Sequence, residues 1–227
     1  MIKADVNRVE QPFFSVVIAT YNRAHLLNRA LNSLLIQTME DWEAIVVDDG
    51  SEDNTSQLIE SYVKADKRIH YFKKEHSGVA LTKNKGIELA KGQFVTFLDS
   101  DDAYKANHLM LRYKYLLNNS SIDFLHGGAK VIGNQFVPNR FDTTKKIHLS
   151  NCKIGGTFFV RKSCLIALSG FKNIPLAEDA DLLERAKVFN CTLMKIKDPT
   201  YIYHRDHQES LTKNLFKQQN KLKNTVN

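Results

Sequence analysis

Short apolar segments alternate with segments of helical periodicity through the first hundred residues. The segment Phe14–Ala19 is continuous, apolar and rich in β-branched residues, as expected for a strand buried on both faces. Further strands are predicted at Ala44–Val47, Ile69–Phe72 and Phe94–Leu98. A regular alternation of strands and helices predicts an α/β protein with a mostly parallel central sheet and helices packed on it.

Three helices are predicted between these strands. Leucines three and four residues apart form one stripe of a helix over Ala24–Gln37, and Asn22 is its predicted N-cap. A second helix is expected from about Asn54, and a third over Val79–Ala90, before Gly92. Each helix is long enough to connect two neighbouring parallel strands.

The second half of the chain is less regular. Helices are predicted over Lys105–Leu117 and Glu178–Phe189. Glycine-containing turns separate short extended segments, which we place at Asp123–His126, Ala129–Ile132, Thr157–Val160, Leu193–Ile196 and Tyr201–Tyr203. With no linker rich in Pro, Gly or Ser, the sequence favours one domain with two functional halves.

Polar clusters follow three of the predicted strands. They are Thr20-Tyr21-Asn22-Arg23, Asp48-Asp49 and Asp99-Ser100-Asp101-Asp102. Ligands of open parallel sheets bind beyond the carboxyl ends of the strands. The three clusters therefore predict a binding site along one edge of the sheet.

The cluster Asp99-Ser100-Asp101-Asp102 has the character of a site for a hard divalent cation. Carboxylates at a tight turn suit Mg²⁺ or Mn²⁺, and the absence of nearby His or Cys argues against Zn²⁺. The alternative is that these residues only cap the turn and the following helix. The sequence contains neither a GxGxxG motif after the first strand nor a GxxxxGK[ST] motif, which disfavours dinucleotide-binding Rossmann domains and P-loop NTPases.

Two further acids have both a functional and a structural interpretation. Asp49 at a strand end suits hydrogen bonds to a base N–H or a ribose hydroxyl, or it is a turn and capping residue. Asp179 opens a helix whose apolar face includes Leu182 and Leu183, which indicates a position at the edge of the core. A carboxylate there can act as a general base, or it reflects the usual acidic bias of a first helical turn.

The charge distribution does not resemble that of a nucleic-acid-binding protein. The net charge is +7, and four lysines and no acidic residue lie between Thr212 and Asn227. Asp41–Glu60 contains seven acidic residues and no basic one. A basic tail beside an acidic region is a poor match to a nucleic-acid-binding face. The tail is either a solvated terminus or a weak amphipathic helix for an anionic membrane surface.

The sequence also bears on the cellular compartment. No apolar run of the length of a signal peptide or a spanning helix is present. The three cysteines form no CxxC pair, which disfavours a disulfide framework and favours a reducing cytosol.

Several motifs in order resemble those of family-two glycosyltransferases. They are TYNR, VDDGSEDNT, KNKGI, FVTFLDSDD, an ED pair and a late His. The resemblance is close from Phe13 to Asp102 and looser to about Ser210. It implies a GT-A fold, with residues 11–102 as the nucleotide-sugar half, 103–210 as the acceptor and catalytic half, and 211–227 as a basic tail.

The resemblance assigns roles in donor binding to residues of the first half. Thr20, Tyr21 and Asn22 would contact the nucleotide, with Tyr21 near the base. Asp49 would bind uracil or an equivalent base, and Lys83 would lie near the diphosphate. Many members have Asn-x-Gly where this chain has His76-Ser77-Gly78, which is a departure from the family pattern in the middle of the donor site.

The resemblance also assigns a metal site and a base. Asp99, Ser100 and Asp101 form the DxD motif, in which Asp99 would face the ribose and Asp101 would bind Mn²⁺ or Mg²⁺. Asp179 of the ED pair would be the catalytic base. His207 is similar to a late His that approaches the metal or the diphosphate in some members, although a solvated loop is the more common position for such a residue.

Together these features predict a metal-dependent inverting glycosyltransferase. The expected donor is a nucleotide-sugar, with UDP-sugars favoured, and the expected acceptor is a saccharide or a lipid-linked saccharide of bacterial surface polysaccharide synthesis. The family places such an enzyme in the cytoplasm or at the inner face of the plasma membrane. The alternatives are a nucleotide-sugar-binding module without turnover and a nucleotidyltransferase.

Overall fold

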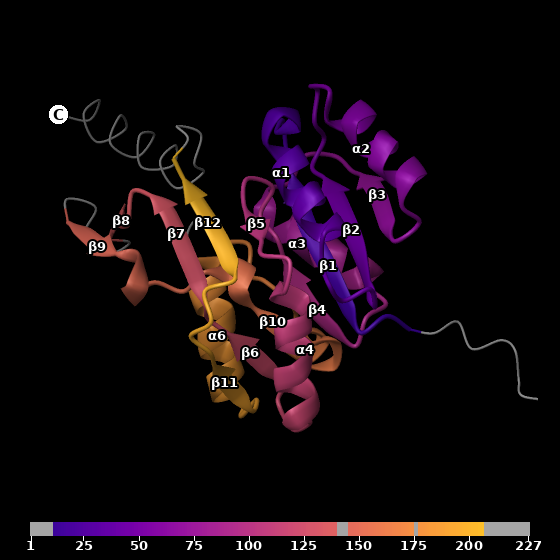
Figure 1. Cartoon of the computed structure of the whole chain (residues 1–227). Helices are drawn as coiled ribbons and strands as arrows, with labels where there is room; N and C mark the ends of the chain where they lie inside the picture. Colours follow the sequence, from indigo (N-terminus) through magenta and orange to yellow (C-terminus); the bar gives the residue numbers. More distant parts are fainter. Residues whose placement is uncertain (1–10, 140–144, 175–176, 207–227) are drawn as a thin grey trace, which may run out of the picture.

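The computed structural model describes residues 11–139, 145–174 and 177–206 (Figure 1). The helices are α1 (Ala24–Leu35), α2 (Thr55–Ala65), α3 (Val79–Leu89), α4 (His108–Asn118), α5 (Lys162–Ala167) and α6 (Glu178–Val188), with the short 3₁₀ turns η1 (Leu149–Asn151) and η2 (Gly155–Thr157). The strands are β1 (Phe14–Thr20), β2 (Trp42–Asp48), β3 (Ile69–Lys73), β4 (Phe94–Phe97), β5 (Ala103–Tyr104), β6 (Phe124–His126), β7 (Ala129–Gly133), β8 (Phe136–Pro138), β9 (Lys146–His148), β10 (Phe159–Arg161), β11 (Leu193–Lys195) and β12 (Tyr201–Arg205).

Seven strands form the central sheet in the order β11-β6-β10-β4-β1-β2-β3. β1 pairs in parallel with β2 on one side and with β4 on the other, and β3 continues the parallel run beyond β2. β10 runs antiparallel to both β4 and β6 and so connects the two halves of the chain within one sheet. The predicted mostly parallel sheet is confirmed, with one reversed strand at the junction.

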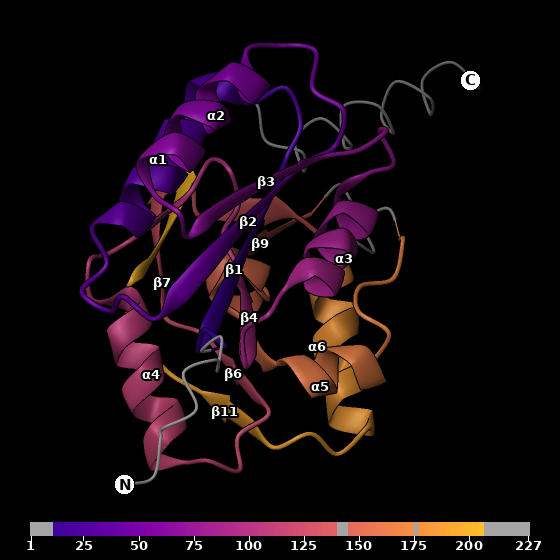
Figure 2. The same cartoon turned by 90° about the vertical axis from the view of Figure 1, so that its right-hand side faces the viewer.

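Helices cover both faces of this sheet (Figure 2). α1, α2 and α4 lie on one face, and α3, α5 and α6 lie on the other. β1 shows why the sheet needs two cores, because Val16 and Ile18 belong to one hydrophobic cluster and Val17 belongs to the other. Successive side chains of a strand point to opposite faces, so a strand covered on both sides must be apolar throughout.

A smaller sheet of three strands lies beside the central one, in the order β5-β12-β7. β12 runs parallel to β7 and antiparallel to β5. Since β5 follows Asp102 directly, this sheet brings β12 against the segment that leaves β4. β8 and β9 form a separate hairpin-like pair.

The predicted helices and strands are present with bounds that differ by a few residues, but two local predictions are wrong. The segment predicted as a strand from Thr157 begins as the turn η2, and its strand starts at Phe159. Asn22 does not cap α1; it has a positive φ of 51°, and its side chain accepts a hydrogen bond from the Glu52 N–H (2.8 Å). The carboxylate of Asp53 instead accepts from the Ala24 N–H (3.1 Å), so an acid from a different loop caps this helix.

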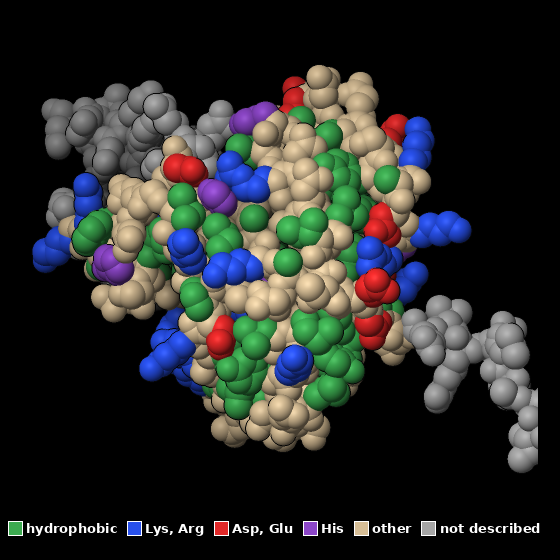
Figure 3. Space-filling view, in the orientation of Figure 1, with side chains coloured by type: hydrophobic (Ala, Val, Ile, Leu, Met, Phe, Trp, Pro, Cys, Tyr) green, Lys and Arg blue, Asp and Glu red, His purple; other side chains and the backbone are tan. Residues whose placement is uncertain are grey.

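The surface has mixed charge. On the face shown in Figure 3, the basic and acidic side chains of the described residues are scattered among apolar and neutral ones and form no continuous basic stripe. In the described ranges, no helix combines the length and the apolar character that crossing a bilayer requires. The predicted basic tail over 211–227 lies outside the described residues.

Candidate active site at the edge of the sheet

The carboxyl ends of β1, β2 and β4 meet at one edge of the sheet. The register pairs Thr20 with Asp48 and Val17 with Phe97, so the three polar clusters leave the sheet side by side. The Asp49 N–H donates to the Thr20 carbonyl (2.9 Å), which keeps the first two clusters together beyond the last paired residues. The common edge predicted from the sequence is therefore present.

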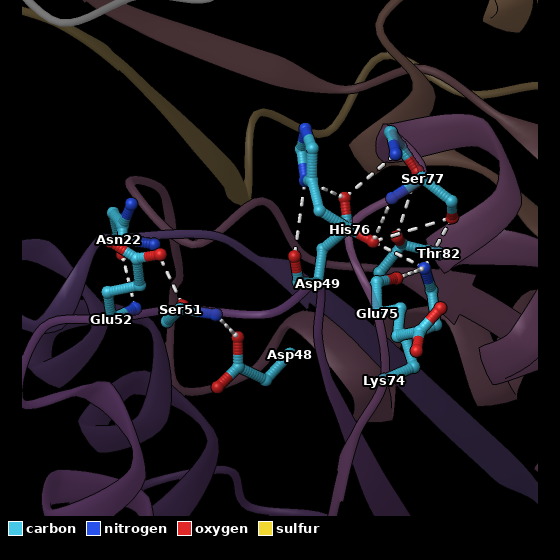
Figure 4. Close-up of polar contacts among 11 residues, drawn as sticks. Asn22, Asp48, Asp49, Ser51, Glu52, Lys74, Glu75, His76, Ser77 and Thr82 are labelled. Carbon is cyan, nitrogen blue, oxygen red and sulfur yellow. Dashed lines mark hydrogen bonds and ion pairs between the residues drawn. The ribbon is translucent and has the colours of Figure 1, made fainter.

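Asp49, which directly follows β2, contacts several residues of the segment 74–78 (Figure 4). Its carboxylate accepts hydrogen bonds from the N–H groups of Ser77 (3.0 Å) and Gly78 (2.8 Å) and pairs with Lys74 and with His76 Nδ1 (2.8 Å). Burial by itself would raise the pKa of Asp49, but Lys74 and the N–H groups outweigh it and hold the pKa below its usual value. Asp49 is thus a fixed carboxylate that shapes this part of the edge.

An aromatic pair lies at the opening of the same region. The rings of Tyr21 and His76 are stacked with centroids 4.2 Å apart and an interplanar angle of 23°. Tyr21 keeps 41% of its surface exposed. The His76-Ser77-Gly78 segment, where this chain departs from Asn-x-Gly, therefore contacts both Tyr21 and Asp49.

The turn after β4 separates its three acids into different environments. Asp101 is held by α1 and the loop before it, because Arg23 Nη1 contacts its carboxylate (2.9 Å) and Arg29 Nη1 donates to its carbonyl (3.0 Å). Asp102 is fully buried and accepts from the Tyr201 hydroxyl (2.5 Å) and from the His204 N–H (2.7 Å). Asp102 thereby fixes β12 to the turn.

Asp99 remains partly open to solvent, with 38% of its side chain exposed. Loss of hydration raises the pKa of Asp99 to about 6; Lys83 opposes this rise, and the neighbouring carboxylates, Asp101 first, add to it. Ser100, between Asp99 and Asp101, is buried. The turn therefore presents Asp99 and Asp101 at the edge of the sheet and keeps Asp102 inside.

Lys83 on α3 joins the two halves of the site. Its ammonium lies 4.0 Å from Asp99 Oδ1 and 3.5 Å from both Glu178 Oε1 and Asp179 Oδ1. Burial would lower the pKa of Lys83, but these three carboxylates outweigh it and raise the pKa above its ordinary value. The pKa of Glu178 is raised by burial and by its neighbour Asp179. A buried cation thus holds the ED pair of α6 beside the end of β4.

The residues at this edge fit a hard divalent cation. Asp99 and Asp101 supply carboxylate oxygens, the donors that Mg²⁺ and Mn²⁺ prefer, and such ions complete their coordination with water and substrate phosphates. Four acids lie near two cations at this edge, and a divalent cation would balance the remaining negative charge; the acids are Asp99, Asp101, Glu178 and Asp179, and the cations are Lys83 and Arg23. Within the described ranges, no three His, Cys, Asp or Glu side chains form a ready-made cage. His207 lies outside the described residues, so its predicted approach to this site stays a prediction.

Comparison with known proteins decides the family. The sequence model described as "Glycosyl transferase family 2" matches residues 15–164. The chain belongs to this family. The glycosyltransferase is 35% identical over 146 residues to the UDP-Glc:alpha-D-GlcNAc-diphosphoundecaprenol beta-1,3-glucosyltransferase WfgD of Escherichia coli, covering 62% of this chain and 56% of that protein. It is 30% identical over 187 residues to an uncharacterized glycosyltransferase of Haemophilus influenzae, covering 79% of this chain and 74% of that one.

Solved structures give the same fold. The crystal structure of S. aureus TarS 1-349 in complex with UDP-GlcNAc matches with a TM-score of 0.73 and 26% identity, covering 87% of this chain and 60% of that one. The mannosyltransferase PcManGT from Pyrobaculum calidifontis, in complex with GDP-Man and Mn²⁺, matches with a TM-score of 0.68 and 19% identity, which shows the fold alone. The GT-A fold expected from the sequence is confirmed. The family member described here spans a little over half the length of its Escherichia coli relative.

Some residues of the site have no signal in the sequence. Tyr201 lies about a hundred positions after the turn that it contacts, and its extended segment has no motif. Gly155 and Gly156 are visible only as a turn signal, although they lie against Asp179 and Tyr201. Arg23 belongs to the TYNR motif, but nothing local to it indicates a contact with Asp101.

Proposed function

We propose that this protein transfers a sugar from a nucleotide-sugar, with UDP-sugars favoured, to an acceptor hydroxyl with inversion at the anomeric carbon. The observation on which the proposal rests is the Lys83 cluster. Asp99, from the predicted donor half, and Asp179, from the predicted acceptor half, both lie within 4.0 Å of one ammonium group. A base carboxylate beside a donor-binding turn is the arrangement that a direct displacement requires.

The first half offers the groups that a nucleotide would need. Tyr21 presents an exposed ring for the base, and Asp49 and Asn22 shape the loops on either side of it. The Thr20 hydroxyl is buried at the end of β1 and has no hydrogen-bond partner among the described residues. Unsatisfied buried hydroxyls are rare in proteins, and a ligand oxygen would satisfy this one.

Asp99 and Asp101 would hold Mn²⁺ or Mg²⁺, with Ser100 between them. When bound, such an ion supplies positive charge to the diphosphate that departs from the sugar. The Lys83 ammonium is a second positive charge at the same edge, already oriented by Asp99 and Asp179. Both positive charges would stabilise the additional negative charge that develops on the departing diphosphate.

Asp179 would act as the general base. It would accept the proton of the acceptor hydroxyl while the acceptor oxygen forms its bond to the anomeric carbon. The bond from that carbon to the diphosphate breaks in the same step, and its electron pair leaves with the diphosphate. One displacement from the face opposite the leaving group inverts the linkage.

We further propose that residues 103–210 bind the acceptor and that the pathway is bacterial surface polysaccharide synthesis. The Escherichia coli relative is named for an acceptor with a diphosphoundecaprenol lipid, and a Bacillus subtilis relative, 38% identical over 111 residues, is named a putative teichuronic acid biosynthesis glycosyltransferase. These likenesses support a saccharide or lipid-linked saccharide as the acceptor. The expected place of reaction is the cytoplasm or the inner face of the membrane.

The test separates donor binding from transfer. UDP-, GDP- and dTDP-sugars are screened for thermal stabilisation with and without Mn²⁺, because a ligand that binds only the folded state raises its stability. Turnover is then followed as nucleotide release, with and without α-D-GlcNAc-diphosphoundecaprenol. We expect Asp101→Ala to lose metal-dependent donor binding, and Asp179→Asn to keep donor binding and lose turnover.

Each other result has a defined meaning. Near-normal turnover by Asp179→Asn would refute the base assignment. Donor binding without any turnover in the unaltered protein, across donors and acceptors, would favour the binding module without catalysis. Pyrophosphate release from a nucleoside triphosphate would favour a nucleotidyltransferase.

A further inference from the structure

The turn η2 lies between the base and the residues that hold the acidic turn of β4. The Gly155 N–H donates to Asp179 Oδ2 (3.0 Å), while the other carboxylate oxygen of Asp179 faces Lys83 (3.5 Å). Asp179 is therefore held at both oxygens, by a backbone amide on one side and by an ammonium on the other. Each carboxylate oxygen still has a lone pair available to accept a proton.

The absence of a side chain at Gly155 is what permits this contact. A Cβ atom at this position would lie under 3.0 Å from three atoms of the Asp179 carboxylate, closer than real Cβ atoms approach other atoms. Gly155 does not have a positive φ, so its backbone conformation is open to any residue. The requirement for glycine here comes from the approach of Asp179 and not from the turn itself.

The next residue has the same relation to a different partner. A Cβ atom on Gly156 would lie under 3.0 Å from the hydroxyl and ring of Tyr201. That hydroxyl donates to Asp102 (2.5 Å) and lies 3.5 Å from Asp99 Oδ2. Gly156 also lacks a positive φ. Its small size makes room for a ring that supports the acidic turn.

We propose that Gly155 and Gly156 form a positioning turn with two separable effects. Gly155 sets the orientation of the Asp179 carboxylate, and Gly156, through Tyr201, sets the position of Asp99 and Asp102. This inference rests on the proposed function, in which Asp179 is the base and Asp99 belongs to the donor site. Each glycine acts through the side chain for which it leaves room, Asp179 at Gly155 and Tyr201 at Gly156.

Alanine substitutions at Gly155 and at Gly156 test whether the two effects are separable. Gly155→Ala should push the carboxylate away from its place and lower kcat about 100-fold, since a displacement of about 1 Å has an effect of that size. The Kd for the donor nucleotide should stay within about twofold of wild type. Gly156→Ala should instead weaken binding of the nucleotide with Mn²⁺, measured by calorimetry.

A double-mutant cycle excludes a general structural effect. If Gly155 acts only through Asp179, Gly155→Ala should cause no further loss in an Asp179→Asn background. An equal loss in both backgrounds, or a kcat of Gly155→Ala within threefold of wild type, would overturn the proposal. Normal turnover by Asp179→Asn itself would instead refute the proposed function, so the two failures are distinguishable.

A second measurement does not depend on the folding of the alanine variants. The amide of Gly155 is observed by NMR in the wild-type chain and in Asp179→Ala. Loss of the acceptor should move this amide proton upfield and speed its exchange with solvent. Gly92, whose N–H donates to Ser15 Oγ (2.7 Å), should not change. An unchanged Gly155 amide would also overturn the proposal.

Discussion

The two halves of the molecule differ in how completely their buried ionisable side chains are bonded. In the first half, the buried ionisable side chains all have hydrogen-bond or ion-pair partners; they are Glu43, Asp48, Asp49, Lys83 and Asp102. Glu43, for example, accepts from Ser15 Oγ and the Lys91 N–H, both at 2.6 Å. In the second half, His108 Nε2 and Arg112 Nε are buried without a hydrogen-bond partner among the described residues. Arg112 still donates to Thr200 and to the Gly127 carbonyl.

This difference indicates what stabilises each half. Buried charges contribute to a fold only when their partners satisfy them, and removing one partner is then costly. The buried charges of the first half depend on such partners, while the second half tolerates incompletely bonded groups within its apolar packing. The following substitutions test this contrast, from the largest expected effect to the smallest.

Lys83→Met should have the largest effect. It removes the ammonium that lies between the carboxylates of Asp99, Glu178 and Asp179, and should lower the free energy of unfolding by about 3 kcal/mol. Lys85→Met on the same helix is the matched control, because the Lys85–Glu88 pair is exposed and should cost less than about 0.5 kcal/mol. Urea unfolding measures both. Equal losses would contradict the importance of the buried cluster.

Tyr201→Phe should have the next largest effect. It leaves the buried Asp102 carboxylate without the hydroxyl that donates to it, at a cost of about 1–3 kcal/mol. Tyr113→Phe is the control, since the Tyr113 ring packs edge-on against Phe13 and should keep that contact. Thermal unfolding of the two variants, compared with wild type, checks the difference. A Tyr201→Phe variant as stable as wild type would show that the second half does not depend on the hydrogen bond from Tyr201 to Asp102.

Arg23→Gln tests whether a protein cation and a metal share Asp101. Arg23 contacts the carboxylate that would bind Mn²⁺, so its removal should tighten Mn²⁺ binding about fivefold, or ~1 kcal/mol. Arg29→Gln is the control, because Arg29 donates to the carbonyl of Asp101 and not to its carboxylate. Paramagnetic resonance of free Mn²⁺ gives both affinities. Weaker binding in Arg23→Gln would mean that Arg23 supports the metal site.

His126→Gln should have the smallest effect, on the pH dependence of stability. Burial, with Lys153 as the next contribution, lowers the pKa of His126 from 6.5 to about 4. Between pH 6.5 and pH 4 the His126 imidazole is protonated in the unfolded chain but mostly neutral in the folded chain. The free energy of unfolding therefore falls as the pH drops from 6.5 towards 4. Allowing for partial solvent screening, this loss is roughly 0.5–1 kcal/mol between pH 7 and pH 5.

Urea unfolding at pH 7 and at pH 5 measures this contribution of His126 to the free energy of unfolding. His126→Gln should reduce the difference in stability between them, whereas His148→Gln on the β8–β9 pair serves as the comparison. An unchanged pH dependence in His126→Gln would show that the imidazole is not held neutral by its surroundings.

Sequence patterns were sufficient for elements whose signal is local. Phe14–Ala19 is predicted as a buried strand because it is continuous, apolar and rich in β-branched residues. The strand that forms, Phe14–Thr20, is buried at every residue but one, and the acids from Asp99 onwards come just after the end of β4. The predicted N-cap at Asn22 is wrong because the side chain, although of a type that suits a cap, accepts a hydrogen bond from the Glu52 N–H, thirty positions away. Local propensity cannot weigh a contact that only folding creates.

The amino-acid order by itself determined the alternation of strands and helices, and with it the sheet edge where Asp49, Asp99 and Asp101 meet. That result follows from period and strand direction, which are properties of neighbouring residues. Only the tertiary structure decided that Lys83 would join Asp99 to Asp179, and that Gly155 and Tyr201 would support them. Those contacts join residues about 16 to 100 positions apart, and their geometry depends on how β10 and β12 pack against the first half.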